Sequence, residues 1–324
     1  MARRVALVLL VTLAIVILTP FWGTVAIPLK SIQIPGSEFH FIFWQLRLPR
    51  ALLGFLAGAI LALAGFLSQN IFKNSLATPD ILGITTGAAA ATMLAIKAGW
   101  SIQWLWGGGG WLFGFIGAVA AMAILLAIAR ILKSFSVYTL LMTGVAINLF
   151  CASFIALVQY FFDFSNMVSA MRWLMGGISQ VGYGEVFLLL ILAAAILLVV
   201  LVFKREIILV SAGDDFALGK GMNVRRFNRT MVMVLAVAVG GVVSVTGPIG
   251  FIALIVPHIS RLLSRNSYQA TVWLLVLIGG GILVFSDFLA RTLLAPIEIP
   301  VGIVTSLLGA PFFLVILLGN LRDR

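Results

Sequence analysis

Ten apolar runs separated by short polar segments make up most of this sequence. They lie at about 5–27, 51–69, 81–96, 109–129, 137–162, 186–203, 230–246, 249–263, 270–289 and 301–319. A helix crosses a bilayer with about 20 mostly apolar residues, because it satisfies its own backbone hydrogen bonds where lipid offers none. The pattern predicts an all-α integral membrane protein of about ten transmembrane helices in a compact bundle. Because no polar segment is long enough for a soluble domain, residues 1–324 are expected to form a single transmembrane domain.

The composition agrees with this class. The chain is 62% hydrophobic and only 10% charged, whereas soluble domains are about half apolar. Its formal net charge of +11 could suggest nucleic acid. However, the basic residues fall in short segments between the runs and not on a patch interleaved with exposed aromatic residues, so lipid is the expected surrounding and nucleic acid is not an expected partner.

The first apolar run has the outline of a signal peptide, since Arg3 and Arg4 precede it. It lacks a convincing small-residue cleavage site and continues through Pro20 into further apolar sequence. We therefore expect an uncleaved first span.

The distribution of lysine and arginine predicts the orientation. With a cytoplasmic N-terminus, the inner segments carry 15 of the 21 basic residues. The outer segments keep Lys30, Arg47, Arg50, Lys97, Arg172 and Arg291. Basic residues favour the cytoplasmic side of a membrane, so both termini are expected on that side. The protein itself is expected in the cytoplasmic membrane of the cell.

The longest polar segment on the inner side runs from Lys204 to Arg229 and is long enough for one or two short helices. It is either a solvated loop or a docking element for a cytoplasmic partner. Its Gly-Lys pair is not a phosphate-binding P-loop, because five residues separate Gly213 from Gly219 and Gly221 follows Lys220.

Catalytic constellations are missing from the sequence. His40 and His258 lie far apart, no H-E-x-x-H motif occurs, and no intramembrane pair of aspartates could activate water. A packed, hydrogen-bonded role is favoured for His258 over a ligand or proton carrier, and Cys151 is expected to be a small packing residue. The sequence therefore favours a protein that is not an enzyme and has no metal site.

Small residues recur along the runs at helical spacing. Gly54 and Gly58 form one G-x-x-x-G pair, Gly83 and Gly87 form another, and residues 279–281 are three consecutive glycines. Such spacing lets helix backbones approach closely, as a compact bundle requires.

Three arginines lie on the side where basic residues are scarce. Arg47 and Arg50 are three apart and share a face if helical, while Arg291 follows Asp287 by four residues. Arg291 either pairs with Asp287 or faces outward with the other two. Snorkelling at the interface would explain one arginine, but it predicts no preference for the outside. Because guanidinium binds carboxylate in a fork geometry, an acidic partner explains the outer cluster better.

Four stretches resemble a known family closely: the permease subunits of type II ATP-binding-cassette importers, which take up ferric siderophores, haem and vitamin B12. The stretches are "RLPRALLGFLAGAILALAG", "NSLATPDILGITTGAA", "GPIGFIALIVPHISRLL" and "DFLARTLLAPIEIPVGIVTSLLGAPFF", and the resemblance covers essentially the whole chain.

The resemblance implies a set of partners. They are a second permease subunit, identical or related, two cytoplasmic ATPase subunits that bind ATP and Mg²⁺, and a binding protein outside; this chain itself would hold no cofactor. The arginines of the R-L-P-R and D-x-x-A-R motifs, here Arg47, Arg50 and Arg291, would receive glutamates of the binding protein.

The resemblance also places the contact with the ATPase in the segment around 204–229. That segment usually reads Ala-x-x-Leu-Gly before basic residues, and Lys220 replaces the leucine here. The expected coupling residues are Asp214, Asp215, Ala217, Lys220, Gly221, Arg225 and Arg226.

By the same resemblance, the run at 137–162 lines the translocation pathway. Its polar residues would contact substrate or water, although bonding of Ser and Thr to their own helix is an equal alternative. These residues are Thr143, Asn148, Ser153 and Gln159. The expected substrate is a ferric siderophore, with haem or vitamin B12 as alternatives within the family. An ion-coupled secondary transporter is disfavoured, because the carboxylates lie at span ends or in loops.

Overall fold

Ten α-helices correspond to the ten apolar runs. The computed structural model describes residues 2–23, 25, 27–34, 36–100, 110–178, 182–265 and 267–322, and within these ranges the chain contains helices and no strand. The ten helices are α1 (Ala2–Leu18), α3 (Leu48–Ile71), α4 (Ile84–Ala98), α5 (Gly110–Ile131), α6 (Val137–Tyr160), α8 (Gly184–Val202), α11 (Val224–Thr246), α12 (Ile252–Ser264), α13 (Tyr268–Thr292) and α14 (Val301–Arg322). The all-α prediction is confirmed.

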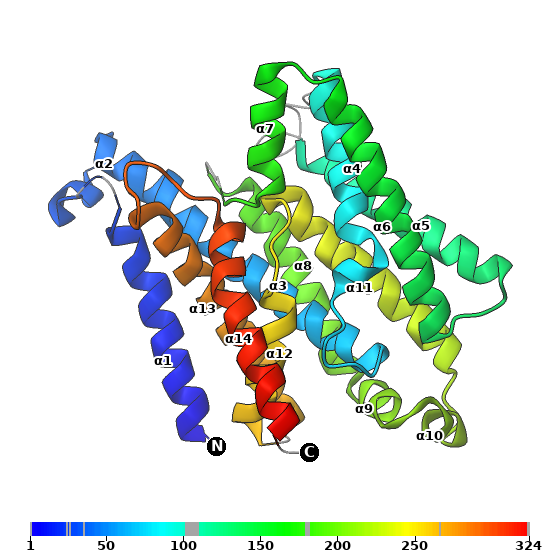
Figure 1. The fold of residues 1–324 in the computed structure, drawn as a ribbon. Coiled ribbons are helices and arrows are strands. Elements are labelled where there is room, and N and C mark those ends of the chain that lie inside the picture. Colours follow the sequence, from blue (N-terminus) through cyan, green and yellow to red (C-terminus); the bar gives the residue numbers. More distant parts are fainter. Residues whose placement is uncertain are drawn as a thin grey trace.

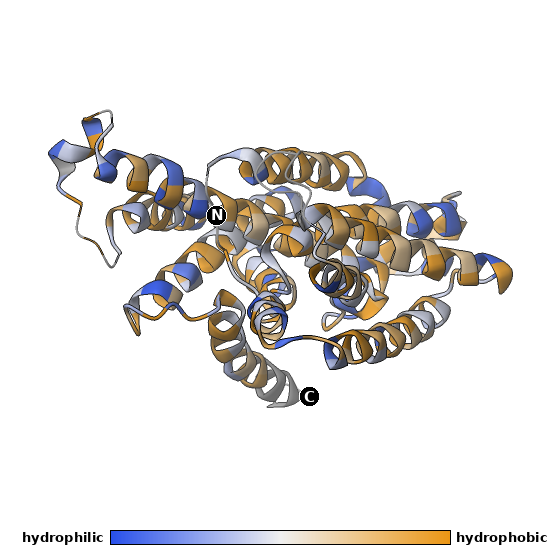
Figure 2. Cartoon of the chain, turned by 90° about the horizontal axis from the view of Figure 1, so that it is seen from above, coloured by the Kyte–Doolittle hydropathy of each residue, from blue (hydrophilic) through white to orange (hydrophobic). Residues whose placement is uncertain are grey.

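Seven helical stretches of the described chain are long and apolar enough to cross a membrane. The shorter apolar helices are α4, α12 and the stretch Val301–Val315 of α14. Figure 2 shows that hydrophobic residues predominate along most helices, as expected for helices that contact lipid or one another. The chain is therefore a multi-pass membrane protein, and a count of ten spans remains a prediction.

Shorter helices connect these elements. They are η1 (Thr19–Phe21), η2 (Leu29–Gln33), α2 (Glu38–Phe41), the π-helix η3 (Ile42–Arg47), η4 (Pro79–Leu82), α7 (Phe164–Leu174), α9 (Lys204–Ala212) and α10 (Asp214–Gly219). Of the one or two short helices expected between Lys204 and Arg229, the structure has two, α9 and α10. However, α11 begins at Val224, so Arg225 and Arg226 lie in its first turn and not in a loop.

Helix α7 was missed because it is amphipathic and too polar to register as an apolar run. It begins after Asp163, whose carboxylate accepts a hydrogen bond from the Asn166 backbone N–H at 2.9 Å. This bond lowers the pKa of the Asp163 carboxyl from its ordinary value. An N-cap aspartate of this kind was the available sequence signal.

The helices form a bundle around α3, which packs against α8, α11, α12 and α13. Figure 1 shows that α1 begins, and α14 ends, at the end of the bundle that also carries α9 and α10. The opposite end carries α2 and the junction between α13 and α14. The bundle therefore presents two different ends, each with its own connecting segments. Arg324, counted above among the inner basic residues, lies outside the described residues.

Proline shapes the entry into α3. Pro49 has no backbone N–H, so the carbonyl of Gln45, four residues earlier, lacks its helical donor. The Gly182 backbone N–H donates to that carbonyl at 2.8 Å instead. The helix passes through the π-turn of η3 just before this point, which puts Arg47 at the end of η3 and Arg50 in the first turn of α3. Both arginines therefore project from one continuous helical stretch.

Glycines set the closest contacts of α3. A Cβ at Gly58 would lie 2.2 Å from the Gly279 carbonyl oxygen, and a Cβ at Gly65 would lie 1.9 Å from that of Ala253. Similarly, a Cβ at Gly87 would lie 2.8 Å from the Gly117 carbonyl oxygen. The small-residue pairs thus join helices within one chain, α3 to α13 and α4 to α5.

We expect Gly58→Ala to destabilise the protein by about 1–3 kcal/mol, because the added methyl would push α3 away from the α13 backbone. Thermal unfolding of the purified protein, followed by tryptophan fluorescence, measures this. Gly219→Ala is the matched control, since a Cβ there has no neighbour within 4 Å. Equal melting temperatures for the two variants would contradict the close approach.

Candidate functional site

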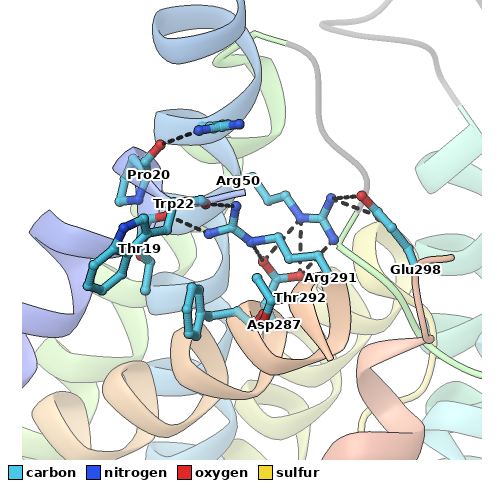
Figure 3. Close-up of polar contacts among 10 residues, drawn as sticks. Thr19, Pro20, Trp22, Arg50, Asp287, Arg291, Thr292 and Glu298 are labelled. Atoms are coloured by element: carbon cyan, nitrogen blue, oxygen red, sulfur yellow. Dashed lines mark hydrogen bonds and ion pairs between the residues drawn. The ribbon is translucent and has the colours of Figure 1, made fainter. Parts of the chain in front are cut away.

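Arg50 lies between two carboxylates at the end of the bundle that carries α2. Its Nε is 3.1 Å from both Asp287 carboxylate oxygens, and its Nη2 is 2.9 Å from Oδ1. On the other side, its Nη1 donates to Glu298 Oε2 at 3.1 Å. Figure 3 shows the guanidinium bridging α13 and the segment before α14. The two carboxylates differ in environment, since the side chain of Asp287 is 6% exposed and that of Glu298 is 55% exposed.

Arg291 uses its donors inside the chain. Its Nη1 donates to the Trp22 carbonyl at 2.7 Å and its Nη2 to the Thr19 carbonyl at 2.5 Å. Its Nε lies 3.7 Å from Asp287 Oδ2, which confirms the i,i+4 ion pair that the sequence allowed. Arg291 is only 8% exposed. It therefore ties α13 to the end of α1 and does not stand free on the surface.

Arg47 contacts the same segment after α1. Its Nη1 donates to the Pro20 carbonyl at 3.2 Å, and its Nη2 donates to the Val25 carbonyl at 2.6 Å. Together with the contacts of Arg291, these bonds bring the three predicted arginines to one site. We call Arg47, Arg50, Arg291, Asp287 and Glu298 the arginine cluster. Sequence reasoning missed Glu298, although it is the only acidic residue between α13 and α14.

A cavity of about 850 Å³ adjoins the arginine cluster. Arg50, Glu298 and Arg172 of α7 contribute to its lining, together with the backbone turn at 175–178 and the segment 296–301. The outward side of Arg50 is therefore accessible, whereas its other side is buried against Asp287.

The opposite end of the bundle carries the predicted coupling residues. Lys73, just after α3, forms an ion pair with Asp214 of α10, with 2.7 Å between Nζ and Oδ1. Ala217 is fully buried and anchors α10 on the bundle. Arg225 donates to the Lys133 carbonyl at 3.2 Å, which links the start of α11 to the segment after α5. The remaining predicted residues, Asp215, Lys220, Gly221 and Arg226, are exposed.

Two apolar side chains stand out on α10. Phe216 is 52% exposed and Leu218 is 56% exposed, on either side of the buried Ala217. Lys220 Nζ lies 5.8 Å from the centre of the Phe216 ring. Sequence reasoning did not select these residues, although apolar residues within a charged segment were a usable signal. They give α10 an apolar surface rimmed by charges, as protein interfaces commonly have.

The four polar residues predicted to line the pathway differ in exposure along α6. Thr143 is buried, and Asn148 donates to the Asp80 and Ile81 carbonyls at 3.1 and 3.2 Å. Ser153 bonds to the Leu149 carbonyl of its own helix at 2.9 Å, and Gln159 is half-buried. The exposed face of α6 includes Tyr138, Met142, Val145, Leu149, Phe150, Ser153, Leu157 and Tyr160.

The histidines and the cysteine lie away from that face. His40 is in α2, with Nδ1 2.8 Å from the Ile32 carbonyl oxygen, and His258 is half-buried in α12. Cys151 is buried in the core, as expected for a packing residue. Among the described residues, no group of three or more His, Cys, Asp or Glu side chains could hold a metal ion.

Known proteins resemble this chain over almost its whole length. It is 35% identical to the uncharacterised ATP-binding-cassette (ABC) transporter permease YvrB of Bacillus subtilis, over 90% of this chain and 83% of that protein. It is 34% identical to HmuU, the hemin transport system permease of Yersinia pestis, over 87% and 85% of the two chains. Permeases for vitamin B12 in Klebsiella pneumoniae and for Fe(3+)-citrate in Bacillus subtilis are each 33% identical.

A solved structure shares the fold. A metal-chelate type ABC transporter in an inward-facing conformation matches with a TM-score of 0.81 at 26% identity, over 97% of this chain and 99% of that one. The model of the FecCD transport family matches residues 7–319. This chain therefore belongs to the FecCD transport family, as a permease of the ABC importer type.

Proposed function

We propose that this permease moves a ferric siderophore across the cytoplasmic membrane by alternating access, driven by ATP hydrolysis in partner subunits. The observation that carries the proposal is the placing of two unlike surfaces at opposite ends of one bundle. The arginine cluster lies at one end, and the apolar surface of α10 lies at the other. A permease that receives cargo on one side and energy on the other needs both.

The arginine cluster is the proposed docking site for a substrate-binding protein outside the cell membrane. Arg47, Arg50 and Arg291 outnumber the carboxylates of the cluster by one, so the site attracts acidic side chains. Arg50 has the accessible guanidinium edge, because the donors of Arg291 bind carbonyls within the chain. In this proposal Arg291 and Arg47 hold the site in shape, and Arg50 makes the direct contact.

The other end, with both termini, would face the cytoplasm and meet two ATPase subunits. Phe216 and Leu218 would enter a groove on the ATPase, with the charged residues around them in contact at the rim. ATP and Mg²⁺ would bind to the ATPase, and this chain would need no cofactor. The ATP cycle must bias the outward-open and inward-open states, because binding of cargo alone cannot drive uphill transport.

A second permease, identical or related, would cover the exposed face of α6 and share the translocation pathway. Ser153 lies on that face, whereas Asn148 and Thr143 point into the chain and would support the shape of α6. Gln159, half-buried near the end of α6, would contact substrate or water.

A ferric siderophore is favoured as cargo because α6 contains no histidine to bind haem iron. The similarity to the Fe(3+)-citrate import permease of Bacillus subtilis supports a ferric chelate as cargo. Haem or vitamin B12 is the second candidate, which the identities to HmuU and the vitamin B12 permease favour.

Uptake into proteoliposomes containing the assembled transporter tests this function. With ATP inside, a radiolabelled ferric hydroxamate should accumulate without any ion gradient, and accumulation should stop when ATP is omitted. Accumulation driven by a proton or sodium gradient would contradict the ABC importer mechanism. Uptake of haem or cobalamin in place of the ferric chelate would reassign the cargo within the family.

A further inference from the structure

The guanidinium of Arg50 has two differently occupied edges. Nε and Nη2 form a bidentate pair with Asp287, a side chain that is 6% exposed. Nη1 points the other way, and its carboxylate partner is Glu298. Because a guanidinium offers five donors in a fixed plane, a ligand can exchange at Nη1 while the pair with Asp287 stays intact.

The side chain of Glu298 is free to move away from Arg50. Its side chain is 55% exposed, and it belongs to the segment between α13 and α14, where Leu294 and Ile297 are also exposed. The Ile299 backbone N–H donates to the Ala290 carbonyl at 2.9 Å, so the segment stays attached when the side chain turns away. The cavity of about 850 Å³ beside Glu298 leaves room for that movement. An exposed ion pair is also weak, since solvent screens it.

The excess of arginines in the cluster favours a carboxylate next to Nη1 of Arg50. With Glu298 in place, three arginines face two carboxylates, and without it they face Asp287 alone. An acidic side chain from a docking protein would restore the balance. It could not approach while Glu298 stayed, because two carboxylates at one donor repel each other.

We propose that Glu298 occupies the binding position of a partner's carboxylate on Arg50 and is displaced when the binding protein docks. This rests on the proposed docking function of the arginine cluster. Glu298 therefore acts as an internal competitor. It neutralises Arg50 in the free permease, and it lowers the apparent affinity for the binding protein in proportion to the fraction of permease in which it occupies Nη1.

Glu298→Asp separates the contact from the charge. Aspartate keeps the negative charge but withdraws the carboxylate by one methylene, about 1.5 Å, out of reach of Nη1. The permease in lipid nanodiscs is titrated with the substrate-binding protein of the same importer, and the dissociation constant is measured by biolayer interferometry. Both Glu298→Asp and Glu298→Gln should tighten docking roughly two- to fivefold, the range expected for release of an exposed ion pair.

Glu38→Gln is the matched control. It also removes one exposed negative charge, but Glu38 lies in α2 and forms no ion pair with Arg50 among the described residues. It should leave docking unchanged. Tightening by Glu298→Gln but not by Glu298→Asp would show a general charge effect and overturn the proposal. Unchanged or weaker docking in both Glu298 variants would overturn it too. Failure of the unaltered permease to bind the protein would instead refute the docking function itself.

Discussion

Replacing Arg291 with glutamate is expected to lower the free energy of unfolding by about 3–5 kcal/mol, the cost of breaking a buried ion pair. The side chain of Asp287 is 6% exposed and would then face a second carboxylate from the same helix. The Thr19 and Trp22 carbonyls would also lose their donors. Chemical denaturation of the protein in mild detergent, followed by tryptophan fluorescence, measures this loss.

Arg172→Glu provides the control for the charge change. Arg172 is exposed on α7 and lines the cavity beside the cluster, so its reversal changes the net charge equally without opening a buried pair. Its stability should stay within about 0.5 kcal/mol of the unaltered protein. Adding Asp287→Asn to Arg291→Glu should recover part of the loss, because the repulsion between carboxylates disappears. A stable Arg291→Glu variant would contradict the assigned pairing.

The buried role of Arg291 changes how docking can be tested. Reversing Arg47, Arg50 and Arg291 together would remove both arginines that pair with Asp287, so a loss of docking could reflect a damaged fold. Variants at Glu298 avoid this problem, since its side chain is exposed and its loss leaves Arg50 paired with Asp287.

The helices could be predicted from the sequence because a membrane leaves the backbone few choices. Each apolar run had to form a helix, and ten helices follow the ten runs. The G-x-x-x-G spacing correctly indicated close helix contacts, and the structure adds the partners, Gly58 with Gly279 and Gly87 with Gly117. Those partners are distant in sequence, so spacing alone could not identify them.

The sequence indicated every member of the arginine cluster except Glu298, but it did not predict the bonds of Arg50. Charge distribution selected Arg47, Arg50 and Arg291, and the i,i+4 spacing suggested Asp287 as a partner of Arg291. The pair between Arg50 and Glu298 joins residues 248 positions apart, which no local pattern reveals. Likewise, α11 extends to Val224 beyond its apolar run, because Asn223 caps it and accepts a hydrogen bond from the Arg226 backbone N–H.

Replacing Phe216 and Leu218 together with aspartate is expected to reduce ATP-dependent uptake at least tenfold. Both side chains are more than half exposed, so the change should leave the melting temperature of the permease unaltered. Loss of two apolar anchors at an interface costs about 2 kcal/mol or more each, enough to release the ATPase subunits. Co-purification of the ATPase with the permease and uptake into proteoliposomes measure both effects.

The variant Phe216→Met with Leu218→Met keeps the surface of α10 apolar and should retain the ATPase and most uptake. Ala217→Asp should act differently from the exposed substitutions. It buries a charge against the bundle, so it should lower the melting temperature of the permease itself. Normal ATPase binding and uptake in the double aspartate variant would show that α10 is not the coupling surface.

Because Asp214 of α10 pairs with Lys73 at the end of α3, movement of α10 would pull on the central helix of the bundle. If α10 is the coupling surface, that contact would link the ATPase to the central helix α3, and the aspartate variants would remove the ATPase from that route.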